Sequence, residues 1–538
     1  MGYSGQSFII DCSKGGLTGN KNIDSVDPND MLAGTRNINL HENGRRKRGG
    51  VVSQFGSAGV SAPEFNNAIL GLYDFRLVDG TQHLMIYVGG TDEGLYYGWE
   101  GEGQHTRLKI MAEGANASFE TFENTLFVAD GANKPQTWNG VAAATSDITS
   151  VPTDWTQNNY PKQLIKHGRG VSERLWGVGF TDTPQNVYAS ANGDGNDFSD
   201  ANTIVTAIET GDGFGIVGGM EFNDNLFCFG KRKTYVIDDS DIDTANWGYD
   251  AGPWSGGVAH WRLLVKTPTD MVAMQEDGEI YSVRAAQEYG DYKLASLTRP
   301  SLMHNWIKDN LNLEEINLFH GIYDPSLRAI RIFCVRNGQT SVDACLVYFI
   351  DRGPKDGWVL HDNTSLAFGY ASASAAIVRT GPGKYECYTG DNSALRGNVW
   401  KLEQETRSDI WRGTTYGYYA GFKTPVINCG DPRTRKNFKR LWLALDPTGN
   451  FDMEIDWWVD GVKQTTTTVD MTGTGGLLGS FTLGTSLLGG DEVFNREATL
   501  GVNGRNIQFE IYNQTKGEDF FINRLMLDYK LLGKEPAE

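Results

Sequence analysis

The chain has 538 residues, of which 39% are hydrophobic and 11% aromatic, enough to bury a large core and to exclude wholesale disorder. Its length predicts roughly two to four domains. The net charge of -19 argues against a protein that grips nucleic acid through phosphate contacts, because these need clustered Lys and Arg. The same acidity either keeps a large protein soluble or repels a DNA backbone that passes along it.

The composition also favours an all-β chain. Glycine occurs 66 times and proline 16 times, a mix that suits many tight turns better than long helices. We find no run of about 18 apolar residues, so the sequence predicts no membrane-spanning helix. The six cysteines are scattered and include no Cys-x-x-Cys pair, which predicts buried free thiols in a reducing compartment and no zinc site.

Residues 1–64 form an N-terminal segment that we expect to contribute strands and subunit contacts. This segment carries one basic run, Arg45, Arg46, Lys47 and Arg48. Four adjacent cations repel one another unless something neutralises them. The run therefore predicts a contact with a neighbouring subunit or with phosphate, and the alternative is a solvated loop of no special role.

Residues 65–412 contain a recurring short strand of apolar and aromatic residues. Five copies are centred on Leu126, Leu175, Leu226, Ile280 and Ile332, about 50 positions apart. This period predicts a β-propeller, because each small antiparallel sheet can bury its faces only against neighbours in a ring. Seven copies predict six to eight blades, and the alternative is a set of unrelated hairpins in another all-β fold. The copies are 84–88, 125–131, 174–179, 225–230, 279–283, 330–334 and 385–390.

The segment 190–198 offers the best candidate for a metal. Its side-chain oxygens, on Asn192, Asp194, Asn196 and Asp197, are of the kind that calcium prefers. Their spacing does not match an EF-hand loop. The simpler interpretation is a tight Asx/Gly turn between blade strands, so we expect no metal here.

Residues 413–538 are predicted to form a C-terminal β-sandwich. Two stretches, 451–457 and 507–512, alternate apolar and polar residues, which is typical of half-buried strands. A basic cluster opens this domain and either faces a neighbouring subunit or is solvated. Its members are Arg433, Arg435, Lys436, Lys439 and Arg440.

The sequence contains no recognisable catalytic constellation. The eight histidines are scattered, and there is no H-E-x-x-H, no G-x-S-x-G elbow and no P-loop. We therefore expect a protein that is not an enzyme, with no catalytic residues and no cofactor. Asp and Glu are abundant, but a pair suited to sugar cleavage would have to meet in space, which sequence cannot show.

Several segments resemble the tail nozzle or tail tube propeller proteins of short-tailed phages, the podoviruses. Residues 37–40, followed by the basic run and Gly49-Gly50, are similar to the opening of these proteins. The segments 122–131 and 175–179 are similar to later blade strands, and 521–529 resembles the final sandwich strand. The resemblance covers most of the chain.

The resemblance implies a structural virion protein that is assembled in the bacterial host cytoplasm. Its subunits would form a hexameric ring below the portal and the adaptor protein, with tail fibres docked outside. DNA would pass through the channel without sequence-specific binding. The alternatives are a propeller-type glycan hydrolase and a receptor-binding tail module, both acting on the bacterial surface.

Overall fold

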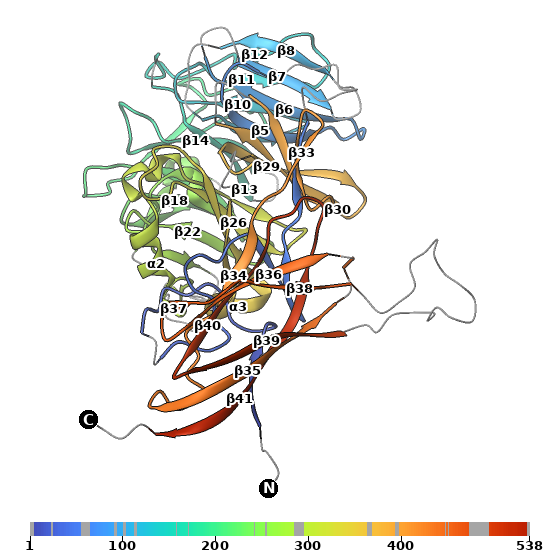
Figure 1. Cartoon of the computed structure of the whole chain (residues 1–538). Coiled ribbons are helices and arrows are strands. Elements are labelled where there is room, and N and C mark those ends of the chain that lie inside the picture. The colour runs from blue at the N-terminus through green and yellow to red at the C-terminus, as the bar shows by residue number, and fades with distance from the viewer. Residues whose placement is uncertain are drawn as a thin grey trace.

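The computed structural model describes most of the chain. Within the described residues the chain is all-β, a β-propeller followed by a C-terminal β-sandwich, as the sequence predicts (Figure 1). In Figure 1 the propeller fills the upper part of the view and the sandwich the lower part. The described residues are 5–22, 25–54, 65–90, 94–99, 104–111, 116–157, 159–169, 172–241, 243–252, 256–283, 295–362, 368–392, 397–446, 448–449, 451–472 and 494–534.

Seven sheets, counted over the described residues, form the blades of the propeller, and all their strand pairs are antiparallel except β4 with β32 in the seventh. The first six have four strands each, paired in chain order. The first strands of successive blades contact one another in sequence, and the seventh contacts the first, which closes the ring. The strands of blades one to six are β5 (Ile69–Arg76), β6 (Gln82–Val88), β7 (Gly94–Trp99), β8 (Gln104–Ile110); β9 (Ser118–Phe122), β10 (Thr125–Ala129), β11 (Gln136–Trp138), β12 (Ser146–Asp147); β13 (Gln163–Arg169), β14 (Ser172–Val178), β15 (Asn186–Ala189), β16 (Ile204–Ala207); β17 (Gly218–Phe222), β18 (Asn225–Phe229), β19 (Thr234–Asp238), β20 (Gly248–Ala251); β21 (Leu264–Lys266), β22 (Met271–Met274), β23 (Ile280–Ser282), β24 (Ala295–Ser296); β25 (His320–Asp324), β26 (Ala329–Cys334), β27 (Ala344–Phe349) and β28 (Trp358–Asp362).

The seventh blade is closed by a strand from the other end of the chain. Its inner strands come from late in the sequence, and the N-terminal strand β4 (Gly50–Ser53) pairs antiparallel with the third of them. The ends of the ring are therefore joined by hydrogen bonds between early and late residues. The remaining strands of this blade are β29 (Ser372–Gly381), β30 (Lys384–Asp391), β31 (Val399–Gln404), β32 (Asp409–Trp411) and β33 (Thr414–Tyr416).

Local sequence explains the first hairpin of two blades. Glu123 and Asn124 separate β9 from β10 with φ of 45° and 61°, and Asn223 and Asp224 separate β17 from β18 with φ of 50° and 58°. Two consecutive positive φ values are typical of the type I′ turn, whose twist matches that of paired strands. Asn and Asp tolerate this backbone region better than other side chains.

The recurring apolar strand lies second in six of the seven blades. In the fifth blade the copy at 279–283 is also a buried strand, but it is β23, the third strand of that blade. The second strand there is β22, Met-Val-Ala-Met, which is as fully buried as β23. Apolar pattern alone could not rank two buried strands that are separated by only a short turn.

The β-sandwich is built from both ends of the chain. Its first sheet has the order β2-β3-β41-β35-β39, with β1 paired to β41, and its second has the order β34-β40-β36-β37, with β38 paired to β36. The alternation predicted near 451–457 and 507–512 is confirmed in the neighbouring strands β36 and β40. The strands are β1 (Gln6–Asp11), β2 (Ile38–His41), β3 (Gly44–Lys47), β34 (Ala420–Lys423), β35 (Thr434–Leu445), β36 (Asp452–Val459), β37 (Val462–Lys463), β38 (Thr467–Asp470), β39 (Phe494–Gly504), β40 (Ile507–Asn513) and β41 (Phe521–Lys534).

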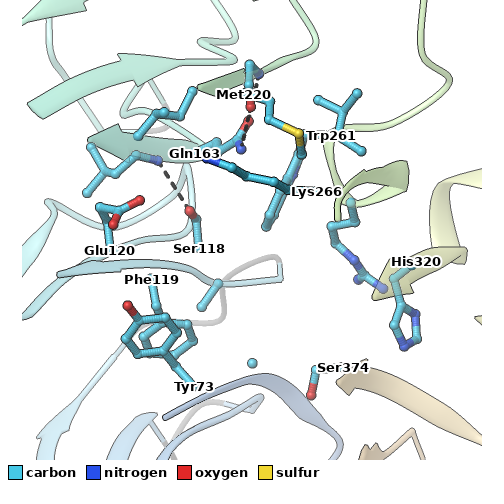
Figure 2. Close-up of a pocket in the computed structure, with 18 of the residues that line it drawn as sticks. Tyr73, Ser118, Phe119, Glu120, Gln163, Met220, Trp261, Lys266, His320 and Ser374 are labelled. Atoms are coloured by element: carbon cyan, nitrogen blue, oxygen red, sulfur yellow. Dashed lines mark hydrogen bonds between the residues drawn. The ribbon is translucent and has the colours of Figure 1, made fainter. Parts of the chain in front are cut away.

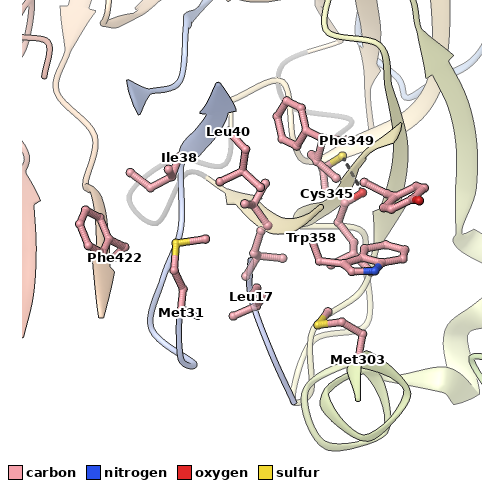
Figure 3. Packing of buried hydrophobic residues seen from close by; sticks show 14 of the residues in the cluster. Leu17, Met31, Ile38, Leu40, Met303, Cys345, Phe349, Trp358 and Phe422 are labelled. Atoms are coloured by element: carbon pink, nitrogen blue, oxygen red, sulfur yellow. Dashed lines mark hydrogen bonds between the residues drawn. The ribbon is translucent and has the colours of Figure 1, made fainter. Parts of the chain in front are cut away.

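The N-terminal segment packs between the propeller and the sandwich. Figure 3 shows Met31, Ile38 and Leu40 between Phe422 of the sandwich and Trp358 of the sixth blade, all in one buried cluster. Backbone hydrogen bonds support this position on both sides. The Asn37 amide donates to the Leu360 carbonyl at 2.8 Å, and the Arg36 amide donates to the Gly421 carbonyl at 3.0 Å. The two domains therefore share one hydrophobic core.

Helices are few and short in the described residues. None of them combines the length and the apolar character that a membrane crossing requires. The six cysteines are free thiols, and all but Cys429 are buried. The helices are α2 (Met303–Asn310) and α3 (Gly353–Asp356), with 3₁₀ turns η1 (Thr244–Asn246), η2 (Trp261–Leu263), η3 (Leu313–Leu318) and η4 (Ile350–Arg352).

Candidate functional site

A hollow of about 510 Å³ lies at the axis of the propeller. Its wall takes residues from the first strand of every blade, so it is formed only when the ring closes. Figure 2 shows polar side chains from different blades around it, among them Ser118, Gln163, Lys266 and His320. A concave site of this volume, with convergent polar groups, is of the size that small ligands occupy in proteins.

Most of the polar wall has a structural role, because a side chain bridges each of the seven blade boundaries. Every bridging side chain both lines the hollow and bonds to the neighbouring blade. In chain order the bridges join Tyr73 to Thr121 (2.9 Å), Ser118 to the Leu164 amide (3.2 Å), Gln163 to the Gly219 amide and carbonyl (both 2.9 Å), Lys266 to Glu221, Arg262 to the Leu318 carbonyl (3.2 Å), His320 to Ser372 (3.1 Å) and Ser374 to the Ile69 carbonyl (2.7 Å).

Glu120 differs from the other carboxylate in the wall. Burial raises the pKa of Glu120 to about 7, so this side chain is close to half protonated near neutrality. Glu221, in contrast, forms an ion pair with Lys266. Two carboxyl groups in one hollow therefore have different protonation behaviour, an arrangement that acid–base sites share with purely structural ion pairs.

Arg262 is the cation of the wall that lacks a carboxylate. It is 9% exposed, and among the described residues no Asp or Glu oxygen lies within 4.0 Å of its guanidinium. Within the part of the chain that the structure describes, its side chain donates one hydrogen bond, to the Leu318 carbonyl at 3.2 Å. Burial lowers the pKa of Arg262 to about 9, because no nearby anion offsets the loss of water.

The predicted basic run lies inside the molecule rather than on a subunit-facing surface. Arg45, Lys47 and Arg48 are all fully buried at 0% exposure. Strand alternation in β3 turns Arg45 and Lys47 to the core, while Arg46 points the other way and pairs with Asp519 at 2.7 Å. A subunit contact therefore does not apply to the three buried cations, and for Arg46, 38% exposed, it stays a prediction.

Arg48 is neutralised within the chain. Its guanidinium donates to both oxygens of Asp409, at 3.2 and 3.1 Å, and to Asn37 Oδ1 at 2.9 Å, and it lies 3.8 Å from the centre of the Tyr418 ring. Burial alone would lower the pKa of Arg48, but the Asp409 carboxylate raises it above its ordinary value. This geometry is what a stable buried ion pair requires.

A second buried ion pair continues the network beside Arg48. Arg331 pairs with Asp324 at 2.8 Å and with Glu403 at 3.1 Å. Glu403 also accepts a hydrogen bond from the Gly49 amide at 2.7 Å and one from Asn39 at 2.8 Å. Burial alone would raise the pKa of Glu403, but Arg331 and the neighbouring cations hold it at about 2. The network therefore ties the N-terminal segment to blades six and seven.

Lys47 and Arg45, the other two buried cations of the run, are held by uncharged groups. Lys47 Nζ donates to Asn513 Oδ1 and to the Thr515 carbonyl, both at 3.0 Å, and burial lowers the pKa of Lys47 to about 8. Arg45 donates to the Lys14 carbonyl at 3.0 Å, and its guanidinium lies 4.6 Å from the centre of the Phe422 ring. Both side chains therefore join the N-terminal segment to the sandwich.

The second basic cluster divides between core and surface. Lys436 is buried, and its ammonium donates to the Thr434 and Arg505 carbonyls at 2.9 Å each, so the predicted subunit contact does not apply to it. Its other four members lie nearer solvent. Arg433, Arg435 and Arg440 are exposed and Lys439 is half-buried. For these four the contact stays a prediction.

The turn at 190–198 uses its carboxylates locally. Asp194 accepts from the Asn196 amide at 2.9 Å, and Asp197 accepts from the Ser199 amide at 2.9 Å, both Asx-turn bonds. Asn192 has an uncharged amide side chain, so it brings no third carboxylate to the turn. Across the described residues, no three His, Cys, Asp or Glu side chains gather in a way that could hold a metal ion.

Sequence reasoning missed the hollow, because its wall comes from first strands while the visible repeat lies mainly in second strands. A weaker signal was available. First strands carry small residues at the axis, such as Gly219 and Gly321, where a Cβ would lie 2.6 Å from Ile165 Cδ1 and from Val265 Cγ2 of the preceding blades. Small and polar residues recurring just before each apolar strand therefore mark the axis.

Comparisons with known proteins bear on the fold only. No model of a known protein family matches the chain, and no curated protein sequence matches it. Similar solved structures include YCF48 bound to D1 peptide (11% identity, 63% of this chain, 92% of that chain, TM-score 0.37). Two others are BamB from Moraxella catarrhalis (12%, 74%, 98%, 0.36) and BBS1N in complex with ARL6DN (10%, 67%, 97%, 0.39). The fold assignment follows from the sheets described above, and these similarities carry no functional argument.

Proposed function

We propose that the chain is a structural subunit of a short-tailed phage tail, part of a ring-shaped nozzle or tube below the portal and adaptor. In this role six copies form a ring through which DNA leaves, and tail fibres dock on its outer surface. The resemblance of the opening, blade and closing segments to such tail proteins suggests this function. The chain then acts mechanically rather than as an enzyme.

The observation that carries the proposal is the position of the N-terminal segment. Strands β1 to β3 belong to the sandwich and β4 closes the propeller. Between them, Arg48 forms a buried ion pair with Asp409 of the seventh blade, and Glu403 of the same blade accepts hydrogen bonds from Asn39 and the Gly49 amide. We expect a propeller and a sandwich that share one core and one continuous segment to move as a unit. Such a unit suits a ring that must keep its shape while DNA passes.

The net charge supports the same proposal. At -19 the chain is acidic, and a ring lumen lined by Asp and Glu would repel the phosphate backbone and leave DNA free to slide. The exposed arginines of β35, Arg435 and Arg440, would face acidic groups of a neighbouring subunit, although Arg440 also pairs with Glu497 of its own subunit at 3.1 Å. Six identical subunits would close through a heterologous contact, in which one face of each copy meets a different face of the next.

The test is the assembly state of the full chain. We expect the purified protein to form a ring with an open centre, alone or on a portal–adaptor complex, visible by negative-stain electron microscopy and mass photometry. The double variant R435E/R440E should weaken assembly without unfolding the subunit. A chain that stays monomeric and fails to dock on portal–adaptor complexes would contradict the proposal, and a basic lumen would contradict the sliding mechanism.

A glycan hydrolase is the second candidate, because the axial hollow contains one carboxyl group with a raised pKa and one that is ion-paired. Glu120, at about 7, has the pKa of a general acid, and Glu221 would be the ionised partner. Release of reducing ends from bacterial surface polysaccharide, lost in Glu120→Gln, would favour this function. Binding to the envelope without turnover or ring formation would favour a receptor-binding module.

A further inference from the structure

We propose that the axial hollow of the propeller binds a small organic anion, a carboxylate or a phosphate, at Arg262. The inference does not rest on the proposed function, because it concerns a single subunit and holds whether or not the chain assembles into a ring.

The first step is the uncompensated charge. A buried cation is costly unless a carboxylate, several uncharged oxygen acceptors or a bound anion offsets its loss of water. The ammonium groups of Lys47 and Lys436 each donate to at least two such oxygens. Arg262 has one bond, to a backbone carbonyl, and no described carboxylate within ion-pair distance, although it lines a hollow that could admit one. Guanidinium groups carry five donors in a flat fork that matches carboxylate and phosphate oxygens. Most of this capacity is not used within the chain.

The second step is the effect of that charge on its neighbours. His260 is the N-cap residue of η2, which contains Arg262, and burial together with the Arg262 charge lowers the pKa of His260 to about 3. The same two causes lower the pKa of His320, which lines the hollow, well below its ordinary value. Both histidines are therefore neutral. Neither adds a positive charge that could bind the anion in place of Arg262.

The third step is the balance of charge around the hollow. The other two cations of the wall are already paired, Lys266 with Glu221 and Lys166 with Glu173, the latter at 2.9 Å. Glu120 is the remaining acid of the wall and is largely protonated below about pH 7. Arg262 therefore makes the hollow locally positive within a chain of net charge -19. An anion is the ligand that this field favours.

The experiment uses the full chain and three probes by isothermal titration: D-glucuronate, D-glucose as its neutral match, and inorganic phosphate. We expect D-glucuronate or phosphate to bind and D-glucose not to bind. Binding of D-glucuronate alone identifies a sugar carboxylate, phosphate alone identifies a phosphate ligand, and both identify a general anion site. If neither anion binds at about 10 mM, or if D-glucose binds equally well, the proposal is overturned.

The variants assign any binding to Arg262. Arg262→Met should weaken anion binding at least about tenfold, and Arg262→Lys, which keeps the charge but not the fork, should weaken it by less. Arg232→Met, at an exposed arginine of the fourth blade, is the matched control and should bind as the unchanged chain does. Thermal unfolding checks that each variant folds. Undiminished binding by a folded Arg262→Met variant would overturn the assignment, and Arg262→Lys decides the matter if Arg262→Met does not fold.

Discussion

Two regions of this molecule bury an arginine and a glutamate, with opposite results. In the network at the N-terminal segment, Arg48 and Arg331 face Asp409, Asp324 and Glu403 across short distances. In the axial hollow, Arg262 faces no carboxylate among the residues that the structure describes. Burial there raises the pKa of Glu120. The first region is electrostatically complete within the chain, whereas the second is not.

The pKa values of the two glutamates record this difference. Burial raises the pKa of both, but cations lower that of Glu403 to about 2, whereas that of Glu120 stays at about 7. The comparison teaches that burial of a charged residue does not by itself distinguish a structural network from a binding site. What separates the two is whether the opposite charges are supplied by the same chain.

The largest effect should come from breaking the completed network. Asp409→Asn leaves the Arg48 guanidinium buried without its carboxylate, and we expect a loss of about 3–5 kcal/mol in the free energy of unfolding. Urea denaturation of the full chain measures it. The matched control is Asp351→Asn, which breaks the exposed Arg328–Asp351 pair and should cost less than about 1 kcal/mol. Equal losses in the two variants would contradict a structural role for the network.

The next effect is the acid sensitivity of Glu403. Its pKa in the folded chain lies below its ordinary value of 4.5, so it stabilises the fold above that pH, and the stabilisation is lost as the pH falls through about 2. The window between these values corresponds to about 3 kcal/mol. We expect Glu403→Gln to be less stable than the unchanged chain at neutral pH and to show a shallower decline below pH 4.5 in thermal unfolding.

The pH dependence of stability that Glu120 causes should have the opposite sign to that of Glu403 and a smaller magnitude. Its folded pKa of about 7 lies above 4.5, so the unchanged chain loses stability as the pH rises between these values. Because the side chain lines a hollow that solvent can enter, we expect this loss in the free energy of unfolding to be about 2 kcal/mol, less than the whole pKa difference would give. Glu120→Gln should remove this loss. Urea denaturation at about pH 8 should therefore find the variant more stable than the unchanged chain. A parallel decline in both proteins would assign the pH dependence to another group.

The smallest effect on stability is expected at the exposed cations of the sandwich. Arg435→Ala and Arg440→Ala remove surface charges from β35 and should change the free energy of unfolding by no more than about 0.5 kcal/mol. Thermal unfolding checks this. Arg440→Ala also breaks the exposed pair with Glu497, which contributes little in water. A larger loss in a monomeric sample would show that these side chains stabilise the subunit itself.

The propeller was predictable because its signal is local. Each blade needs buried apolar residues in its second strand, and tight turns such as Glu123-Asn124 before it, so the pattern repeats about every 50 residues. The copy at 279–283 lies third rather than second in its blade, and the sequence pattern does not order β22 and β23 because both are fully buried. The alternating strands of the sandwich were predictable in the same way.

The sites were much less predictable. The run of four cations at 45–48 indicates a surface contact by composition, but strand alternation and the late residues Asp409, Asn513 and Thr515 place three of the four in the core. The axial hollow left only the weak signal of small and polar residues in first strands, because its wall takes two to four residues from each of seven strands that lie far apart in the chain.

The sequence by itself determined the strands, their turns and the repeated sheets, because these depend on residues that are close together in the chain. The tertiary structure alone decided that β4 closes the ring, that Arg48 meets Asp409 and that Arg262 meets no carboxylate among the residues that the structure describes. The physical reason is that electrostatic pairing depends on distance in space. Partners more than three hundred positions apart, such as Arg48 and Asp409, leave no periodic trace in the sequence.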